Sequence, residues 1–146
     1  MSSAVHGYGT ELQRGDGAGS ETWTTVAEVT NVAMSGLTTE TIDVSNHSSA
    51  SAHREHIAGM KDAGDVTFSI NYQPALNSAA GHGHTTGILA DYANRTDRNW
   101  KLVFPDAGST TFAFKGVITS WSTSAAIDSQ LGADVTVKIT SAPTLA

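Results

Sequence analysis

Strict alternation of apolar and polar residues between Asp65 and Tyr72 is the clearest pattern in the chain. Successive side chains of a β-strand point to opposite sides of a sheet, so the apolar residues of this segment share one face. These residues are Val66, Phe68, Ile70 and Tyr72. Residues 134–140 alternate in the same way, with Val135, Val137 and Ile139 on one face. Both segments are predicted to form strands that bury one face.

Four further segments are rich in β-branched and aromatic residues, which are enriched in sheets. They are residues 22–29, 37–44, 99–104 and 110–121. In the third segment, Trp100, Leu102 and Phe104 are expected to face inward. In the last segment, the apolar positions change phase across Gly116. This change predicts a β-bulge at the glycine.

One helix is predicted between the strands. Thr85 or Thr86 is suited to cap its start, and it runs through Tyr92. Its apolar stripe consists of Ile88, Leu89, Tyr92 and Ala93. Such a short helix is not stable alone in water, so we expect it to lie across a sheet. The chain is therefore predicted to be mostly β (α+β), a single domain over residues 1–146 with an antiparallel β-sandwich or small barrel, one flanking α-helix, a long β-hairpin loop and a flexible N-terminal arm.

Two segments do not read as core elements. Residues 1–20 hold five glycines among small residues, which is typical of a flexible arm. Residues 45–61 form a long Ser- and His-rich loop between two strands. Connections longer than about 12 to 15 residues are normally functional or disordered. We therefore interpret residues 45–61 as a projecting, partner-binding loop.

Composition narrows the function further. The 146 residues include no cysteine, so disulfides and thiolate chemistry are excluded. Eight basic and fourteen acidic residues give a net charge of −6, which argues against binding a phosphate backbone. No basic leader precedes an apolar core at the N-terminus, and no apolar run has the roughly 20 residues of a membrane helix. The sequence therefore predicts neither a membrane anchor nor a nucleic-acid binding protein.

Candidate catalytic and metal sites are weak. The histidines of 53–56 and the pair His82 and His84 lack the spacing of a helical zinc site, and histidines in such loops are usually solvated. The sequence contains no nucleophile elbow, no phosphate-binding glycine loop and no dinucleotide fingerprint. Asp43, Asp65 and Asp134 would need to converge to act as an acid and base pair on a glycoside. The sequence therefore predicts no enzyme, no cofactor and no metal.

The strand pattern favours assembly instead. Several strands carry Ser, Thr, Asn and acidic residues on one face and apolar residues on the other. An open antiparallel sheet leaves edges that invite pairing with other copies, and a ring of subunits would satisfy them. If the polar face lined the ring, its carboxylates would repel a polyanion that passed through.

The order of these segments resembles the lambda-type tail tube proteins, also called major tail proteins, of long non-contractile phage tails and gene transfer agents. The resemblance spans nearly the whole chain and rests on the order and spacing of the following pieces. They are Gly7-Tyr8-Gly9-Thr10, Val26-Ala27-Glu28-Val29, Ile42-Asp43-Val44, residues 61–68, the helix with Leu89, residues 100–106, residues 114–118 and residues 135–140.

The resemblance implies hexameric rings that stack into a virion tail tube, assembled in the bacterial host cytoplasm, with a channel through which DNA passes without specific binding. It implies further contacts with a tape-measure protein, a tail terminator and tail-tip or distal tail proteins. The arm and the loop should bridge neighbouring rings, with Tyr8, Ser45, His47, His53, Arg54, His56 and Met60 as contact candidates. The candidates for the acidic lumen are Glu40, Asp43, Asp65 and Asp134. Some family members carry a C-terminal immunoglobulin-like domain, and none is expected here.

Two alternatives remain open at the level of sequence. A stand-alone carbohydrate-binding or adhesin-like β-sandwich would use tryptophans as sugar platforms, and the candidates are Trp23, Trp100 and Trp121. Tryptophans on strands more often fill cores. The hexameric tube protein of contractile secretion systems resembles tail tubes in fold and shares the ring architecture.

Overall fold

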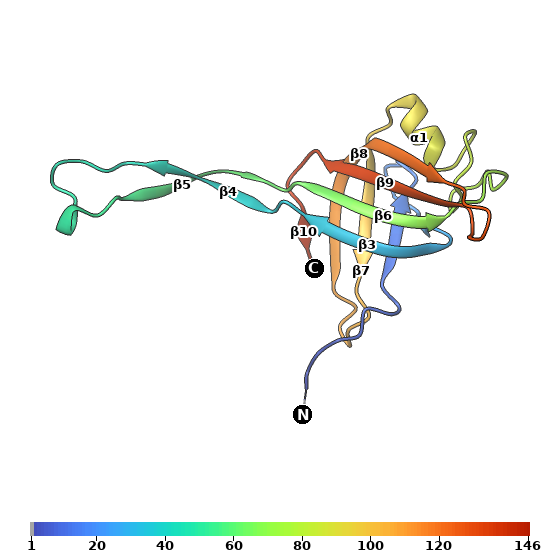
Figure 1. The fold of residues 1–146 in the computed structure, drawn as a ribbon, viewed down its shortest axis with the longest axis horizontal. Helices are drawn as coiled ribbons and strands as arrows, with labels where there is room; N and C mark the ends of the chain where they lie inside the picture. The colour runs from blue at the N-terminus through green and yellow to red at the C-terminus, as the bar shows by residue number, and fades with distance from the viewer. Residues whose placement is uncertain (1) are drawn as a thin grey trace.

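The computed structural model describes residues 2–146, which contain ten β-strands, one α-helix and one short 3-10 turn (Figure 1). The elements in chain order are β1 (Glu11–Gly15), β2 (Trp23–Thr25), β3 (Val29–Ser35), β4 (Thr38–Asp43), the 3-10 turn (Ala50–Ala52), β5 (His56–Asp62), β6 (Asp65–Asn71), α1 (Ile88–Asn94), β7 (Arg98–Val103), β8 (Thr111–Ser124), β9 (Gly132–Ile139) and β10 (Thr144–Leu145). Among the described residues, no helix has the length and hydropathy needed to cross a membrane.

Eight strands form one antiparallel sheet with the order β2-β1-β7-β8-β9-β6-β3, and β10 pairs with β8. Strand β8 pairs with β7 through its first half and with β9 through its second half. The register of β8 and β9 shifts between Ile118 and Ser120. In Figure 1, β7 and the start of β8 run across the direction of β3, β6 and β9. The sheet is therefore folded over on itself, and β8 belongs to both layers.

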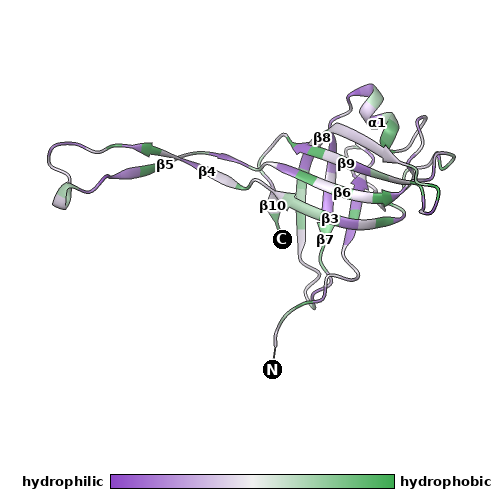
Figure 2. Cartoon of the chain, viewed as in Figure 1, coloured by the Kyte–Doolittle hydropathy of each residue, from purple (hydrophilic) through white to green (hydrophobic). Residues whose placement is uncertain are grey.

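The core lies between these two layers. It is built from alternate residues of the strands, and the bands of hydrophobic and hydrophilic residues along β6 are visible in Figure 2. Phe68 of β6 and Trp100 of β7 meet across the layers with ring centroids 6.1 Å apart. The buried apolar cluster consists of Leu12, Val26, Val66, Phe68, Ile70, Ile88, Trp100, Leu102, Phe112, Phe114, Ile118, Ala133, Val135, Val137 and Ile139.

The predicted fold class is confirmed: the chain is a mostly antiparallel β structure with one short helix. The strands predicted at 65–72, 99–104 and 134–140 are present as β6, β7 and β9. Their apolar faces are buried as expected, apart from Phe104 and Tyr72, which are partly buried at the edge of the core. These strands were predictable because each presents a row of apolar residues on its buried face.

The flexible arm predicted over 1–20 is wrong for its second half. Residues 11–15 form β1, which lies between β2 and β7 in the sheet, and Leu12 and Arg14 are buried. Met1 lies outside the described residues. The alternation of β1 was hidden because one of its buried residues is an arginine.

The strand predicted over 22–29 is interrupted. Glu28 has a left-handed backbone with φ of 57°, and this residue separates β2 from β3. Strand β3 continues to Ser35, beyond the predicted end. Its outer face contains polar or small residues and its inner face is only partly buried, so its pattern is weak.

The bulge predicted at Gly116 is also misplaced. Gly116 lies in register with both Arg98 of β7 and Ile139 of β9, and the irregularity follows Ile118. A Cβ at Gly116 would lie 2.6 Å from the carbonyl oxygen of Lys138. The glycine therefore permits close packing on β9 and does not break the ladder.

The predicted helix exists, but its start and its buried face differ. It begins at Ile88 after Gly87, and neither Thr85 nor Thr86 caps it with a side-chain hydrogen bond. Its buried residues are Ile88, Ala90 and Asp91. Tyr92 and Ala93, expected in the apolar stripe, are exposed. A carboxylate, Asp91, therefore lies on the buried face of the helix, where Tyr92 and Ala93 were expected.

Residues 45–61, predicted as the long loop of a β-hairpin, form the end of that hairpin: residues 45–55 connect its two strands, and residues 56–61 already belong to β5. Strands β4 and β5 pair with each other from Thr38 and Asp62 to Asp43 and His56, and they form a separate two-stranded sheet. Every residue of β4 is exposed. Figure 1 shows the hairpin projecting far from the folded body.

Candidate assembly surfaces

The β4–β5 hairpin leaves the sheet through two closely apposed glycines. Gly36 and Gly64 have φ values of 90° and 71°, a conformation that favours glycine. A Cβ on Gly64 would collide with the carbonyl oxygen of Ser35 and would lie 2.7 Å from the Cα of Gly36. At these two glycines the backbone that enters the hairpin and the backbone that leaves it lie too close together to admit a side chain. We refer to this point as the glycine crossing.

Lys138 of β9 links this crossing to the sheet. Its Nζ lies 3.2 Å from an Asp62 oxygen and 3.8 Å from an Asp65 oxygen, so it contacts carboxylates on both sides of Gly64. The amide of Gly64 donates a 2.8 Å hydrogen bond to Asp62. This bond, followed by the charge of Lys138, holds the pKa of Asp62 below its usual range. These contacts fix the base of the hairpin.

The hairpin and its base expose large apolar side chains. Leu37, Ile42, Val44, Ile57 and Met60 are all exposed, and Met60 retains 82% of its surface. Clustered exposed apolar residues mark interaction surfaces, because their burial against a partner releases water. The hairpin is therefore the first candidate surface for assembly.

The end of the hairpin is polar and internally ordered. The Asn46 side chain accepts a 2.8 Å hydrogen bond from the Ser48 amide, and the Ser45 hydroxyl accepts a 2.8 Å bond from the Glu55 amide. Arg54 is 81% exposed and lies 3.8 Å from Asp43. Six of the residues predicted as inter-ring contacts lie exposed on this hairpin, namely Ser45, His47, His53, Arg54, His56 and Met60.

The N-terminal segment is a second exposed surface. Residues 2–10 precede β1 and extend away from the body in Figure 1. Tyr8 retains 87% of its surface, and Val5 retains 61%. Tyr8, the remaining inter-ring candidate, is therefore also accessible to a partner.

A third surface is the outer face of β3, β6, β9 and the end of β8. The strand pairing and the alternation of burial place polar or small residues on this face. They are Asn31, Ala33, Ser35, Asp65, Thr67, Ser69, Asn71, Ser120, Ser122, Asp134, Thr136 and Lys138. We refer to this set as the polar face. Such a composition suits a surface that stays wet.

The four lumen candidates divide between two surfaces. Asp65 and Asp134 belong to the polar face, where Asp134 accepts a 2.6 Å hydrogen bond from Ser69. Glu40 and Asp43 lie on β4 of the hairpin. The four carboxylates therefore do not form one cluster.

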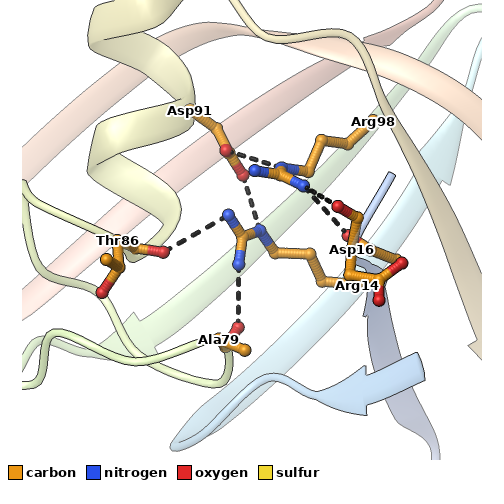
Figure 3. Close-up of polar contacts among 7 residues, drawn as sticks. Arg14, Asp16, Ala79, Thr86, Asp91 and Arg98 are labelled. Atoms are coloured by element: carbon orange, nitrogen blue, oxygen red, sulfur yellow. Dashed lines mark hydrogen bonds and ion pairs between the residues drawn. The ribbon is translucent and has the colours of Figure 1, made fainter. Parts of the chain in front are cut away.

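The most buried charges lie elsewhere, beneath helix α1 (Figure 3). Asp91 accepts a 2.6 Å hydrogen bond from Nε of Arg14 and a 2.7 Å bond from Nε of Arg98. Asp91 is 3% exposed and Arg14 5% exposed. The carboxylate thus ties α1 to β1 and β7.

Both guanidinium groups also donate to backbone carbonyl oxygens. Arg14 donates to Ala79 at 3.0 Å and to Thr86 at 3.4 Å, and Arg98 donates to Asp16 at 2.9 Å. These bonds hold the segment that precedes α1 and the residue that follows β1. The cluster therefore stabilises the fold, because the guanidinium groups of Arg14 and Arg98 donate their hydrogen bonds to acceptors within the chain.

His82 is a second buried polar group. Its Nε2 lies 2.7 Å from the carbonyl oxygen of Ala27, and its Nδ1 accepts a 3.2 Å bond from the amide of Gln73. Burial lowers the pKa of His82, although the Ala27 carbonyl and the charge of Glu28 act in the opposite direction. The neutral ring, with its proton on Nε2, satisfies both partners.

The positions of the histidines and tryptophans give little support to a metal site or to a carbohydrate-binding site. Residues 2–146 contain no group of three His, Asp or Glu side chains placed to hold a metal ion. His82 is buried in the bonds just described, whereas His84 is exposed. Trp100 is 1% exposed and fills the core, and Trp121 packs against Tyr72 with ring centroids 5.3 Å apart. Trp23 lies under the ammonium of Lys101.

Sequence reasoning missed the Arg14, Asp91 and Arg98 cluster. One signal was present: Leu12 and Arg14 are two residues apart and share a strand face, so an arginine occupies a core position of β1. An arginine on a buried face needs a carboxylate partner. The sequence did not indicate which carboxylate this was.

The comparisons agree with this architecture. The family model described as "Lambda phage tail tube protein" matches residues 8–146. A chain in the tail of an empty gene transfer agent (GTA) particle, refined with C6 symmetry, superposes with a TM-score of 0.74 at 18% identity, over 98% of this chain and 99% of that chain. A chain of the native GTA virion gives a TM-score of 0.73 at 15% identity, with the same coverage.

The SPP1 tail tube protein superposes with a TM-score of 0.63 at 10% identity, over 97% of this chain and 78% of that chain. At these identities the structural matches establish the fold alone. No curated protein sequence shows significant similarity to the chain.

Replacing Asp91 with Asn should lower the free energy of unfolding by about 3 to 5 kcal/mol, because two guanidinium groups would lose their buried counter-charge. Urea unfolding followed by tryptophan fluorescence measures the change. The matched control is Asp97→Asn, which removes an exposed carboxylate 3.4 Å from Lys115 and should cost less than about 1 kcal/mol. Equal effects of the two variants would contradict the role of Asp91.

Stability should fall as the pH drops below about 6.5, the usual pKa of histidine, because the unfolded chain binds a proton on His82 before the folded chain does. The contribution of His82 is complete above that pH and is lost as the pH falls toward the lowered folded pKa. His82→Gln should flatten this pH dependence in urea unfolding between about pH 7.5 and pH 5. The exposed His84→Gln should keep the original slope, and a flattened slope in that control would contradict the assignment.

Proposed function

Because the chain belongs to the lambda phage tail tube protein family, we propose that its copies form six-membered rings that stack into a tube and enclose a channel for DNA. As a member of this family, the protein is a structural component of a virion tail and not an enzyme. The observation that carries the proposal is the hairpin, an ordered, projecting element that leaves large apolar side chains exposed.

The unpaired edge strands of the sheet are an argument for the proposed ring. Strands β2 and β3 end the sheet order, and end strands present unpaired backbone groups. A closed ring of identical copies places one end against the next and leaves no free edge. The six-fold number is taken from the GTA tail, which was refined with C6 symmetry.

In the proposed tube, the polar face lines the channel. Asp65 and Asp134 would then face passing DNA, and Lys138 is occupied by Asp62 and Asp65. A weakly negative, hydroxyl-rich wall repels phosphate and offers it no cation to bind. We assign Glu40 and Asp43 to contacts of the hairpin, because β4 lies outside the sheet.

The hairpin and the N-terminal segment would contact neighbouring rings. The proposed contact residues are Tyr8, Ser45, His47, His53, Arg54, His56 and Met60. Assembly around a tape-measure protein, with a terminator at one end of the tube and tip proteins at the other, completes the proposal. A chain from a structure of the sheath/tube terminator of an extracellular contractile injection system superposes on this chain with a TM-score of 0.71 at 10% identity, over 100% of this chain and 99% of that chain.

Deleting residues 38–62 should leave a folded protein that forms no stacked tubes. Ser35 and Asp65 are paired in the sheet, so the deletion leaves the four residues Gly36, Leu37, Ala63 and Gly64 as the turn of a short hairpin. Circular dichroism and urea unfolding check the fold, and electron microscopy over a concentration series checks assembly. Stacked tubes from the deletion variant would refute the role of the hairpin. If the wild-type protein formed neither rings nor tubes, the result would count against the proposed function.

Replacing Asp134 with Lys should make assembled tubes retain DNA, because six added cations per ring would face the channel. Tubes are assembled with a short DNA oligonucleotide, treated with nuclease, and analysed for protected DNA. Glu11→Lys is the matched control, since Glu11 is exposed on β1, away from the polar face. Equal protection in the two variants would show that the polar face does not line the channel.

A further inference from the structure

An open groove lies at the base of the hairpin, with a volume of about 1060 Å³. It is bounded by the first residues of β4, the last residues of β5 and the segment that follows β9. Its apolar walls include Leu37, Met60 and Pro143. Leu37 is 60% exposed, so the groove is unfilled by the chain itself.

The turn between β8 and β9 lies at the opposite end of the same strands. The pairing of β8 with β9 ends at Ser124 and Gly132 beside this turn, whereas Ile139, at the other end of β9, lines the groove. Eight residues of strand span about 25 Å. Figure 1 shows the turn and the hairpin at opposite ends of the body.

This turn carries an apolar side chain with no support from its own chain. Ile127 is fully exposed, at 106% of its reference surface, between Ala126 and Asp128. An isoleucine held free at the tip of an ordered turn is a suitable anchor for a groove, since its burial removes a large apolar surface from water. One end of the molecule thus carries a protruding apolar side chain, and the other end carries an apolar groove.

One pair of charges is complementary, namely Lys61 in the groove and Asp128 next to Ile127. Among the described residues, Lys61 in the groove forms no ion pair, and neither does Asp128 next to Ile127. Asp62 in the groove is already paired with Lys138. Glu40 is the remaining charged residue of the groove, and the strand register places Lys61 opposite Thr39. Among the described residues Glu40 forms no ion pair either, so an arriving Asp128 finds one unpaired cation, Lys61, beside one unpaired carboxylate.

We propose that the β8–β9 turn of one copy docks into the hairpin-base groove of a second copy, with Ile127 against Leu37 and Met60 and with Asp128 beside Lys61. The contact joins different surfaces of two identical chains. A head-to-tail contact of this kind generates an open stack and not a closed pair. The proposal rests on the proposed tube and specifies a contact between successive rings that is separate from the hairpin strands.

Disulfide trapping tests this contact, because the natural chain has no cysteine. The test variant carries Ile127→Cys and Met60→Cys in the same chain, and both positions are exposed, so the fold should tolerate them. Mild oxidation under assembly conditions should convert it into a ladder of covalent oligomers, because each copy can link to two others. Each single-cysteine variant should stop at dimers.

Two matched double-cysteine variants test whether another segment occupies the groove. Met60→Cys is combined with Tyr8→Cys on the N-terminal segment, or with Ala52→Cys at the end of the hairpin, both on exposed positions. A ladder from either of these pairs, with none from the Ile127 pair, would overturn the proposal. Tubes by electron microscopy without an Ile127 ladder would overturn this inference alone, whereas the absence of both tubes and ladder would count against the proposed function as well.

Charge reversal gives an independent check. Lys61→Glu or Asp128→Lys alone should raise the protein concentration needed for tubes by about tenfold or more, because like charges would then meet. The double variant should return this concentration toward the original value. Failure of the double variant to recover, with folded protein by circular dichroism, would contradict the pairing of these two residues.

Discussion

The structure depends on a sheet that has only one apolar face. A single face of this kind must be buried, and in this chain it is buried by folding the sheet over on itself around β8. The register shift after Ile118 lets the second half of β8 continue in the other layer, where it pairs with β9. The other side of β3, β6 and β9 consequently remains available to water, and this is the polar face on which the proposed channel depends.

The chain separates surfaces that are satisfied internally from surfaces that are not. Asp91 and His82 have their hydrogen-bond partners within the body, so these buried polar groups stabilise the fold and are unavailable for chemistry. The hairpin and its groove have the opposite character, with apolar side chains left exposed and Lys61 unpaired among the described residues. The buried polar groups of the body are therefore satisfied within one copy, whereas the hairpin and its groove would bury their apolar side chains only against a partner.

Sequence pattern predicted the elements whose alternation is enforced by burial. Strands β6, β7 and β9 were found because apolar residues fill one side of each. Strand β1 was missed because Arg14 occupies a core position, and β5 because an exposed hairpin imposes no alternation at all. The partner of Arg14 depends on contacts between residues 77 positions apart, which periodicity does not encode. The family was recognisable from the order of segments, but the positions of its surfaces required the fold.

The glycine crossing has a mechanical consequence. At Gly36 and Gly64 the hairpin is joined to the body by two backbones that carry no side chains, whereas the body itself is braced by its core and by the salt bridges of α1. Torsion at this joint is therefore restrained by the close backbone contact of the two glycines and by the ion pairs of Lys138, and not by a packed core. In a stack of copies, curvature would concentrate at such joints, so a long filament could flex while the bore within each ring kept its shape.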